Sequence, residues 1–327
     1  MADIAREASV GVATVDRVLN QRGGVRQATR MSVLAAVARL QGRTDAPMTG
    51  VTHRRFGLLL DSGESFNHSM ENAAKRLARQ LRGITIASHS VTTGAFDAAR
   101  FAETIRRFGK ENDGLMIVAR QDPEINRSLR ELAENGKPVI CLTTDLPGSG
   151  RHACIGVDQT KAGAMAGFFI GRFLKKEKGH MLLFVSAPYR CQEERETGFR
   201  RVIRSDYPWL SVEESLSTND HPDYSYARMK AHLENNPPPL AIYNVGGGNL
   251  GIARALEEAG CARQVVFVAH ELNDNSRRCL ERGSIDVVLH HDIEEELRTA
   301  IAMLNRRDCS ERGSIILPTL VATPHTI

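Results

Sequence analysis

The stretch IYNVGGGNLGIARAL, residues 242–256, has the spacing of a known chemical motif. Gly246, Gly248 and Gly251 fit G-x-G-x-x-G, and the flanking apolar residues predict a strand before the loop and a helix after it. Such a loop brings a pyrophosphate to a helix N-terminus. Glu271 lies 20 residues beyond Gly251, where a dinucleotide-binding fold keeps its ribose-binding carboxylate. An NAD-dependent oxidoreductase is therefore one interpretation of these residues.

Other polar residues follow the apolar runs of the sequence. In doubly wound sheets, ligands bind beyond the carboxyl ends of the strands. Carboxylates accept hydrogen bonds from neighbouring hydroxyl groups and an arginine donates to a further oxygen, so this combination suits a polyol. For any single residue, a helix cap or a surface loop is an equally good interpretation. The residues at these positions are Asp61, Ser62, Asp145, Asn244, His270, Glu271, His291 and Asp292.

Catalytic chemistry could use the same histidines and acids, but no complete catalytic motif accompanies them. The sequence contains no G-x-S-x-G, no G-x-x-x-x-G-K-[ST] and no H-E-x-x-H. His290 and His291 are adjacent on an expected strand, so their side chains point to opposite faces and would not share an ion. The six cysteines are scattered without a C-x-x-C pair, which indicates reduced thiols. We expect no catalytic residues, no metal and no cofactor.

The elements that must position these residues begin at residue 56. Short apolar runs alternate there with amphipathic helical stretches, which predicts parallel sheets with helices on both faces and right-handed crossovers. The series restarts near Cys154–Gly163 and has too many units for one core. We therefore expect two tandem doubly wound α/β lobes with a ligand cleft between them. The expected strands are 56–62, 84–91, 114–119, 138–145, 180–187, 240–245, 265–270 and 287–292.

A small basic head precedes this body. Residues 1–55 contain nine arginines and four acidic residues, a net charge of +5, whereas the whole chain has +4. Such a head suits a polyanion, although a solvated basic face explains the charge equally well. Residues 41–55 have almost no large apolar side chain, which predicts a linker. No apolar run approaches about 20 residues and no signal-peptide pattern opens the chain, so we expect a cytoplasmic protein without a membrane partner.

Apolar spacing in residues 1–40 predicts three short helices. The first two would run from about Ala2 to Ala8 and from Val12 to about Leu19, as in a helix-turn-helix, whose second helix enters the major groove of DNA. A generic three-helix bundle has the same periodicity. The expected DNA contacts are Val12, Ala13, Thr14, Arg17 and Asn20 near the recognition helix, and Arg22, Arg26 and Arg30 at phosphates.

The stretch DIAREASVGVATVDRVLNQRGGVRQATRMSVLAAVARL resembles the head of the LacI/GalR family of bacterial transcription repressors. The family pattern is close to D-[VI]-A-x-x-A-G-V-S-x-x-T-V-S-R-V-[LV]-N, followed by V-x-x-x-T-R-x-x-V. In that family the head is attached to a two-lobed body similar to type I periplasmic sugar-binding proteins. The matching residues are Asp3, Ile4, Ala5, Ala8, Val10, Thr14, Val15, Arg17, Val18, Leu19, Asn20, Val25, Thr29, Arg30 and Val33.

Some positions depart from the family pattern. Ser9 and Gly11 stand where the family turn has Gly and Ser, respectively. Asp16 replaces a serine of the recognition helix, and a carboxylate there would repel phosphate or accept from a cytosine amino group, so we expect an altered operator. The linker lacks the Pro-Asn hinge helix and the leucine that enters the minor groove. Hinge folding on DNA therefore does not follow from this sequence.

The resemblance also implies ligand contacts in the body. Asp145 in TTD and Arg195 in EERETGF match family ligand positions, Glu271 replaces a family aspartate, and His291 stands where a glutamine is common. A family Asn-Asp pair is replaced in the NVGGGN loop by apolar and glycine residues. Asn244 or Asn249 would then supply the lost polarity, and the bare loop makes a phosphorylated or acidic ligand worth testing.

Together these features predict a DNA-binding transcriptional regulator, expected to be a repressor and not an enzyme, controlled by a small sugar or polyol effector. One helix-turn-helix reads a half-site, so a homodimer on palindromic double-stranded operator DNA is expected. The alternatives are the NAD-dependent oxidoreductase and a cytosolic solute-binding protein that never binds DNA. The expected domains are a head at 1–40, a linker at 41–55 and a body at 56–327, with a first lobe of about 56–157 plus 293–308 and a second of about 159–290 plus 314–327.

Overall fold

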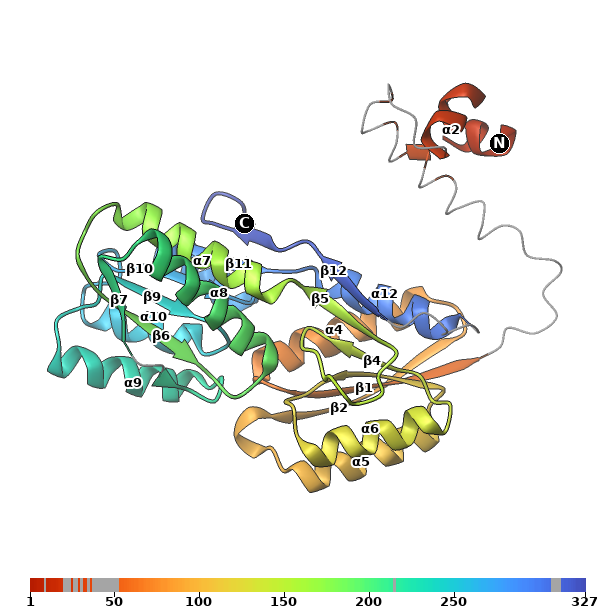
Figure 1. Cartoon of the computed structure of the whole chain (residues 1–327), viewed down its shortest axis with the longest axis horizontal. Coiled ribbons are helices and arrows are strands. Elements are labelled where there is room, and N and C mark those ends of the chain that lie inside the picture. Colours follow the sequence, from red (N-terminus) through yellow and green to blue (C-terminus); the bar gives the residue numbers. More distant parts are fainter. Residues whose placement is uncertain are drawn as a thin grey trace. The chain divides into compact units, whose positions relative to one another are not determined.

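The computed structural model describes residues 1–8, 10–19, 25, 29, 32, 33, 36, 53–213, 216–306 and 313–327 (Figure 1). The chain forms two compact units, Met1–Thr52 and His53–Ile327. The first unit contains α1 (Ala2–Glu7) and α2 (Val12–Leu19), at the positions expected for the helix-turn-helix. Its small core contains Ala5, Val15, Val18 and Val33. The predicted DNA contacts Asn20, Arg22, Arg26 and Arg30 lie outside the described residues.

The first lobe of the second unit contains a six-stranded parallel sheet in the order β12-β5-β4-β3-β1-β2. One apolar core lies between the sheet and helices α4 and α12, and another lies under α5 and α6. The strands are β1 (Arg54–Ser62), β2 (Ile84–Thr92), β3 (Gly114–Val118), β4 (Val139–Leu142), β5 (Ala153–Val157) and β12 (Gly313–Leu317). The helices are α4 (Glu64–Gln80), the short 3-10 helix η1 (Thr93–Ala95), α5 (Ala98–Glu111), α6 (Pro123–Glu134) and α12 (Ile293–Asn305).

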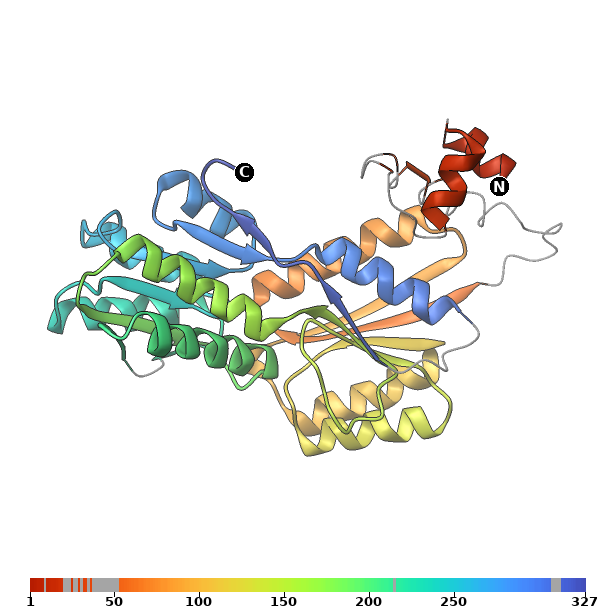
Figure 2. The ribbon, with the colours of Figure 1, turned by 45° about the horizontal axis from the view of Figure 1, so that its top comes forward.

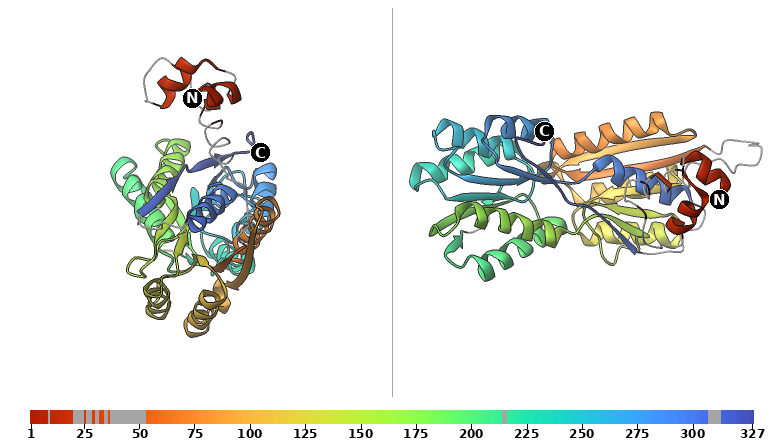
Figure 3. Two further views of the ribbon diagram at one scale, coloured as in Figure 1. Left: turned by 90° about the vertical axis from the view of Figure 1, so that its right-hand side faces the viewer. Right: turned by 90° about the horizontal axis from the view of Figure 1, so that it is seen from above.

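The second lobe contains a seven-stranded sheet in which β13-β11-β10-β9-β6-β7 are neighbours and β8 also pairs with β6. Helices α7 and α8 cover one face, and α9, α10 and α11 cover the other (Figure 3). The strands are β6 (Gly179–Val185), β7 (Leu210–Val212), β8 (Leu216–Ser217), β9 (Ala241–Asn244), β10 (Val266–His270), β11 (Val287–His290) and β13 (Leu320–Ala322). The helices are α7 (Gln159–Leu174), α8 (Arg190–Asp206), α9 (Pro222–Asn235), α10 (Asn249–Glu258) and α11 (Asp274–Arg282).

Each of the expected strands is present, and two tandem α/β lobes are confirmed. Two boundaries need correction. Arg54 and Arg55, expected in the linker, already belong to β1. Residues 314–317, expected in the second lobe, lie in β12, which pairs in parallel with β5 of the first sheet (Figure 2). In sequence, residues 313–317 (GSIIL) show no polar/apolar alternation, and only the structure shows that Ile315 and Leu317 pack against the core of the first lobe.

Candidate functional site

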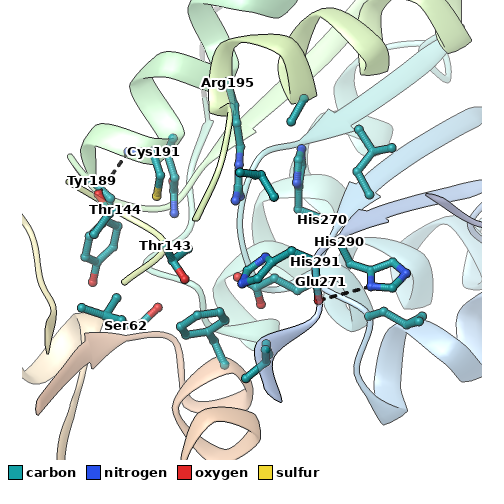
Figure 4. Close-up of a pocket in the computed structure, with 18 of the residues that line it drawn as sticks. Ser62, Thr143, Thr144, Tyr189, Cys191, Arg195, His270, Glu271, His290 and His291 are labelled. Carbon is teal, nitrogen blue, oxygen red and sulfur yellow. Dashed lines mark hydrogen bonds between the residues drawn. The ribbon is translucent and has the colours of Figure 1, made fainter. Parts of the chain in front are cut away.

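A cavity lies where strands of the two lobes end (Figure 4). The first lobe supplies Thr143 and Thr144, which follow β4, and the second supplies Arg195 from α8. His270 and Glu271 come from the end of β10. The apolar part of the wall contains Phe66, Val118, Val157, Ala162, Leu272, Leu289 and Ile293. The cavity therefore combines convergent polar groups with apolar surface, as small-molecule sites do.

Of the ten residues that the sequence names as ligand candidates, Ser62 and four others line this cavity, Asp292 caps α12, and the remaining four are engaged elsewhere. The strand-end rule correctly located part of the wall, because carboxyl ends of parallel strands converge at one edge. Whether these residues bind a ligand stays a prediction. The four others in the wall are Arg195, His270, Glu271 and His291. Those whose side chains are engaged elsewhere are Asp61, Asp145, Asn244 and Asn249.

Arg195 is the only arginine or lysine among the described residues that line the cavity. Its side chain is buried, and its Nε donates to Gln159 Oε1 at 2.7 Å while Nη1 donates to the carbonyl oxygen of Val245 at 2.6 Å. Both partners are neutral, and no ion pair found among the described residues includes Arg195. These two bonds fix the plane of the guanidinium, and neither of them neutralises its positive charge.

Burial disfavours the charged forms of the neighbouring His270 and Glu271. Burial lowers the pKa of His270 well below its ordinary value, and the positive charge of Arg195 lowers it further. Its Nε2 lies 2.8 Å from the hydroxyl oxygen of Tyr243. Burial raises the pKa of Glu271 to about 8, with a contribution from Asp220 and an opposing one from Arg195. A protonated Glu271 donates a hydrogen bond as well as accepting one, so it can pair with a ligand hydroxyl.

This raised pKa predicts a pH dependence of stability. The ordinary glutamate pKa is 4.5, so between that value and about 8 the folded protein holds one proton more than the unfolded chain. The stability that this proton contributes is complete below pH 4.5 and is lost as the pH rises, by at most about 1.4 kcal/mol per unit. Glu271→Gln removes this titration. The melting temperature of the variant should therefore rise relative to that of the parent protein as the pH increases from about 5 to 8. Glu281→Gln, at an exposed position, is the control and should follow the parent protein.

A buried carboxylate that the sequence analysis missed supports the opposite wall. Glu296 on α12 is fully buried and accepts from the backbone N–H of Thr143 at 2.6 Å and from its Oγ1 at 3.0 Å. Its Oε2 also lies 3.0 Å from His291 Nε2. Thr143 has a positive φ of 60°, a conformation that these bonds help to hold. Glu296 follows two other glutamates, Glu294 and Glu295, in a run that looks solvent-facing in sequence.

Asp61 and Asp145 do not line the cavity, because nearby arginines engage their carboxylates. Arg120 donates to both oxygens of Asp61, at 2.8 Å and 2.7 Å, and Tyr189 of the second lobe also donates to Asp61, at 2.9 Å. Arg151 forms a corresponding two-bond pair with Asp145. The Asp61 pair is therefore part of the contact between lobes. The Asp145 pair lies within a loop of the first lobe.

The glycine loop is filled by the protein's own groups. The backbone N–H of Gly247 donates to the carboxylate of Asp220 at 2.6 Å, so an acidic side chain occupies a position that a pyrophosphate would need. Asn244 donates to the carbonyl oxygen of Gly247 at 2.8 Å, and Asn249 donates to that of His270 at 2.8 Å. The two asparagines thus hold the loop in place. These contacts explain the loop without a dinucleotide.

At two positions of the motif, the local structure explains why the residue is glycine. Gly248 precedes α10 with a φ of +84°, which side chains rarely adopt. A Cβ on Gly251 would lie 1.8 Å from the carbonyl oxygen of Pro222, so its absence lets α10 pack closely against α9. Two of the three glycines of the motif are therefore accounted for by a turn and a helix contact.

Comparison with known families agrees with this architecture. Residues 56–307 match the family model "Periplasmic binding protein domain", and residues 1–41 match "Bacterial regulatory proteins, lacI family". The protein belongs to the lacI family of bacterial regulatory proteins. Its periplasmic-binding-protein-like body contains the cavity, and its head contains the helix-turn-helix. No helix in the described part of this lacI-family chain is long and apolar enough to cross a membrane.

Curated relatives of this lacI-family protein include catabolite control protein A from two bacteria. The protein from Staphylococcus epidermidis is 24% identical over 264 residues, which cover 79% of this chain and 77% of that protein. The protein from Priestia megaterium is 26% identical over 272 residues, with the same two coverages. These alignments cover about four fifths of this chain and three quarters of each relative.

Solved structures show the same fold for the body. GanP, a glucose-galactose binding protein from Geobacillus stearothermophilus, aligns with a TM-score of 0.74 at 18% identity, over 84% of this chain and 98% of that one. An ABC transporter solute binding protein from Bacillus halodurans C-125 with bound myo-inositol aligns with a TM-score of 0.75 at 15% identity, over 85% and 97%. The lacI-family body thus has a type I periplasmic-binding-protein-like fold.

Proposed function

We propose that this lacI-family regulator acts in the cytoplasm as a homodimeric repressor on palindromic DNA, and that a sugar or polyol in the cavity controls its affinity for DNA. The observation that carries the proposal is Arg195, a buried cation with neutral partners in a cavity lined by both lobes. No catalytic step is required of these residues.

The chemistry of the wall supports a hydroxyl-rich ligand. Arg195 donates, protonated Glu271 donates and accepts, and Thr143 presents a further hydroxyl group, whereas Phe66 offers an apolar surface for the carbon face of a ring. The glucose-galactose and myo-inositol binding proteins that share this fold bind ligands of the same class. A sugar acid would add a charge pair with Arg195 and is the second ligand class to test.

The control of DNA affinity would come from the position of the cavity. A ligand that contacts Thr143 in one lobe and Arg195 in the other stabilises one arrangement of the lobes and so changes the spacing of two heads in a dimer. Binding free energies are coupled in both directions. Operator DNA should therefore change ligand affinity by the same factor as the ligand changes DNA affinity.

The exposed face of α2 supports the DNA-binding part of the proposal. Val15 and Val18 are buried in the core of the head, whereas Val12, Ala13 and Arg17 are exposed. The N-terminal side chains of α2 are thus available to base edges, as a recognition helix requires. The carboxylate of Asp16 is only half-buried on the same helix and would alter the sequence preferred.

Removal of the head tests this proposal directly. A variant that begins at His53, the start of the second compact unit, should lose DNA binding by at least about 1,000-fold and keep its ligand, because the specific and phosphate contacts belong to the head. The measurement selects bound fragments of genomic DNA at low salt, and then compares sugars, polyols and sugar acids in a thermal-shift screen. Failure of the full chain to enrich any palindrome would contradict the regulator proposal. Equal DNA binding by the truncated chain would contradict the role of the head.

A further inference from the structure

Two histidines and a glutamate converge at a position on the second lobe outside the cavity. His180 lies near the start of β6, Glu213 directly follows β7, and His232 lies in the last turn of α9. One ligand atom from each residue lies within 4.8 Å of the other two, in the only such group found among the described residues. The residues are far apart in sequence, which is why an inspection of motif spacing gave no metal site.

His232 bonds to the backbone of Pro237, but this bond leaves the Nε2 atoms of both imidazoles unused. Nε2 of His180 and Nε2 of His232 are both buried and unpartnered. The nearest carboxylate oxygen, Oε1 of Glu213, is 3.9 Å from His180 Nε2, which is too long for a hydrogen bond. A buried polar atom left without a partner is destabilising, and here two such nitrogens belong to one cluster with a carboxylate.

We propose that His180, Glu213 and His232 form a Zn²⁺ site. Two imidazole nitrogens and a carboxylate are a common three-ligand set for zinc, with water as the fourth ligand. The centre of an equilateral triangle with 4.8 Å sides lies about 2.8 Å from each corner, and zinc bonds to these atoms are about 2.0–2.2 Å long. Small side-chain rotations therefore close the site. The side chains of His180 and Glu213 are 26% and 47% exposed, which leaves a path for the ion and room for water.

The position of the site indicates what the ion would do. It joins the start of β6, the end of β7 and the end of α9, so it fastens the edge of the second sheet to a helix that covers it. The effector cavity lies beyond the opposite end of β6, where Tyr189 follows the strand. Zinc would therefore stabilise the lobe without contacting the effector.

Titration of the metal-free full-length protein with Zn²⁺ tests the proposal. We expect one ion per chain at micromolar affinity or better, and a rise in melting temperature of roughly 5 °C when the free ion is about 100 times its Kd. Cobalt bound in its place should give the visible absorption of a tetrahedral Co²⁺ complex, a signature that a merely structural histidine pair does not produce. Absence of saturable binding would overturn the proposal.

Matched variants locate the ion. His180→Ala and His232→Ala should each abolish the stoichiometric site. Glu213→Gln, at a more exposed position, should weaken it by at least the roughly 10-fold that the loss of an outer-shell partner costs. His68→Ala, which removes a histidine outside the cluster and on another lobe, should leave the cobalt spectrum unchanged. If either histidine variant fails to fold, Glu213→Gln still decides the question. Unchanged affinity in Glu213→Gln, or a spectrum lost with His68→Ala, would place the ion elsewhere.

Discussion

Replacement of Arg195 by alanine is expected to weaken effector binding by about 10- to 150-fold. A hydrogen bond to a charged group contributes about 1.5–3 kcal/mol, and Arg195 is the only arginine or lysine among the described residues of the wall. Its hydrogen-bond partners, the side chain of Gln159 and the carbonyl of Val245, are neutral. They do not neutralise the positive charge of Arg195, which therefore remains available to a ligand. The measurement is a calorimetric titration with the sugar, polyol or sugar acid identified in the thermal-shift screen.

Two further variants separate charge from geometry. Arg195→Lys keeps the charge but loses the planar fork, so it should recover part of the affinity for an acidic ligand and little for a neutral one. Arg204→Ala removes an exposed arginine from the last turn of the same helix and should bind like the parent protein. Affinity for operator DNA without effector should be unchanged in both. Parent-like effector binding by Arg195→Ala would remove the main support for the cavity as the effector site.

The fold was largely predictable because its signals are local. Alternation of buried strands with amphipathic helices gave the parallel sheets and the two lobes, and helical spacing gave α1 and α2. The edge strand β12 was assigned to the wrong lobe, since pairing between residues 313–317 and β5 joins segments far apart in the chain. Long-range pairing of an exposed edge leaves no periodic trace in the sequence.

The site was predictable only in part. The sequence shows which residues lie at the ends of strands, but it does not show which other residues their side chains contact. His270 and Glu271 reach the cavity, whereas Asp61 at the end of β1 meets Arg120. That arginine follows β3 and has no spacing that links it to Asp61. Glu296 was missed for the opposite reason, since only the packing of α12 against β4 shows that its carboxylate is buried.

A change of Gly251 to alanine should destabilise the protein by about 3 kcal/mol or more, at the upper end of the cost of overpacking a core. The added Cβ would lie 1.8 Å from the carbonyl oxygen of Pro222, which is backbone, so only a movement of α9 away from α10 relieves the clash. For a body of this size, that loss corresponds to a fall of roughly 6 °C or more in melting temperature. Differential scanning calorimetry measures it, with Gly94→Ala as the control, because a Cβ at Gly94 meets nothing within 4 Å.

The same variant distinguishes the two interpretations of the glycine motif, a dinucleotide-binding loop and a structural contact between α9 and α10. If the loop bound a dinucleotide, the parent protein would show saturable NAD binding, and Gly251→Ala would weaken it. In the structure, Asp220 accepts from the backbone of the loop, and α9 begins at Pro222, two residues further along. Gly251 is therefore needed by the contact between α9 and α10, which lies close in sequence to Asp220 and its bond to the loop. We expect Gly251→Ala to weaken effector binding because α9 is displaced. NAD binding should be absent from both the variant and the parent protein. A small change in stability would show that α9 moves more freely than its packing indicates.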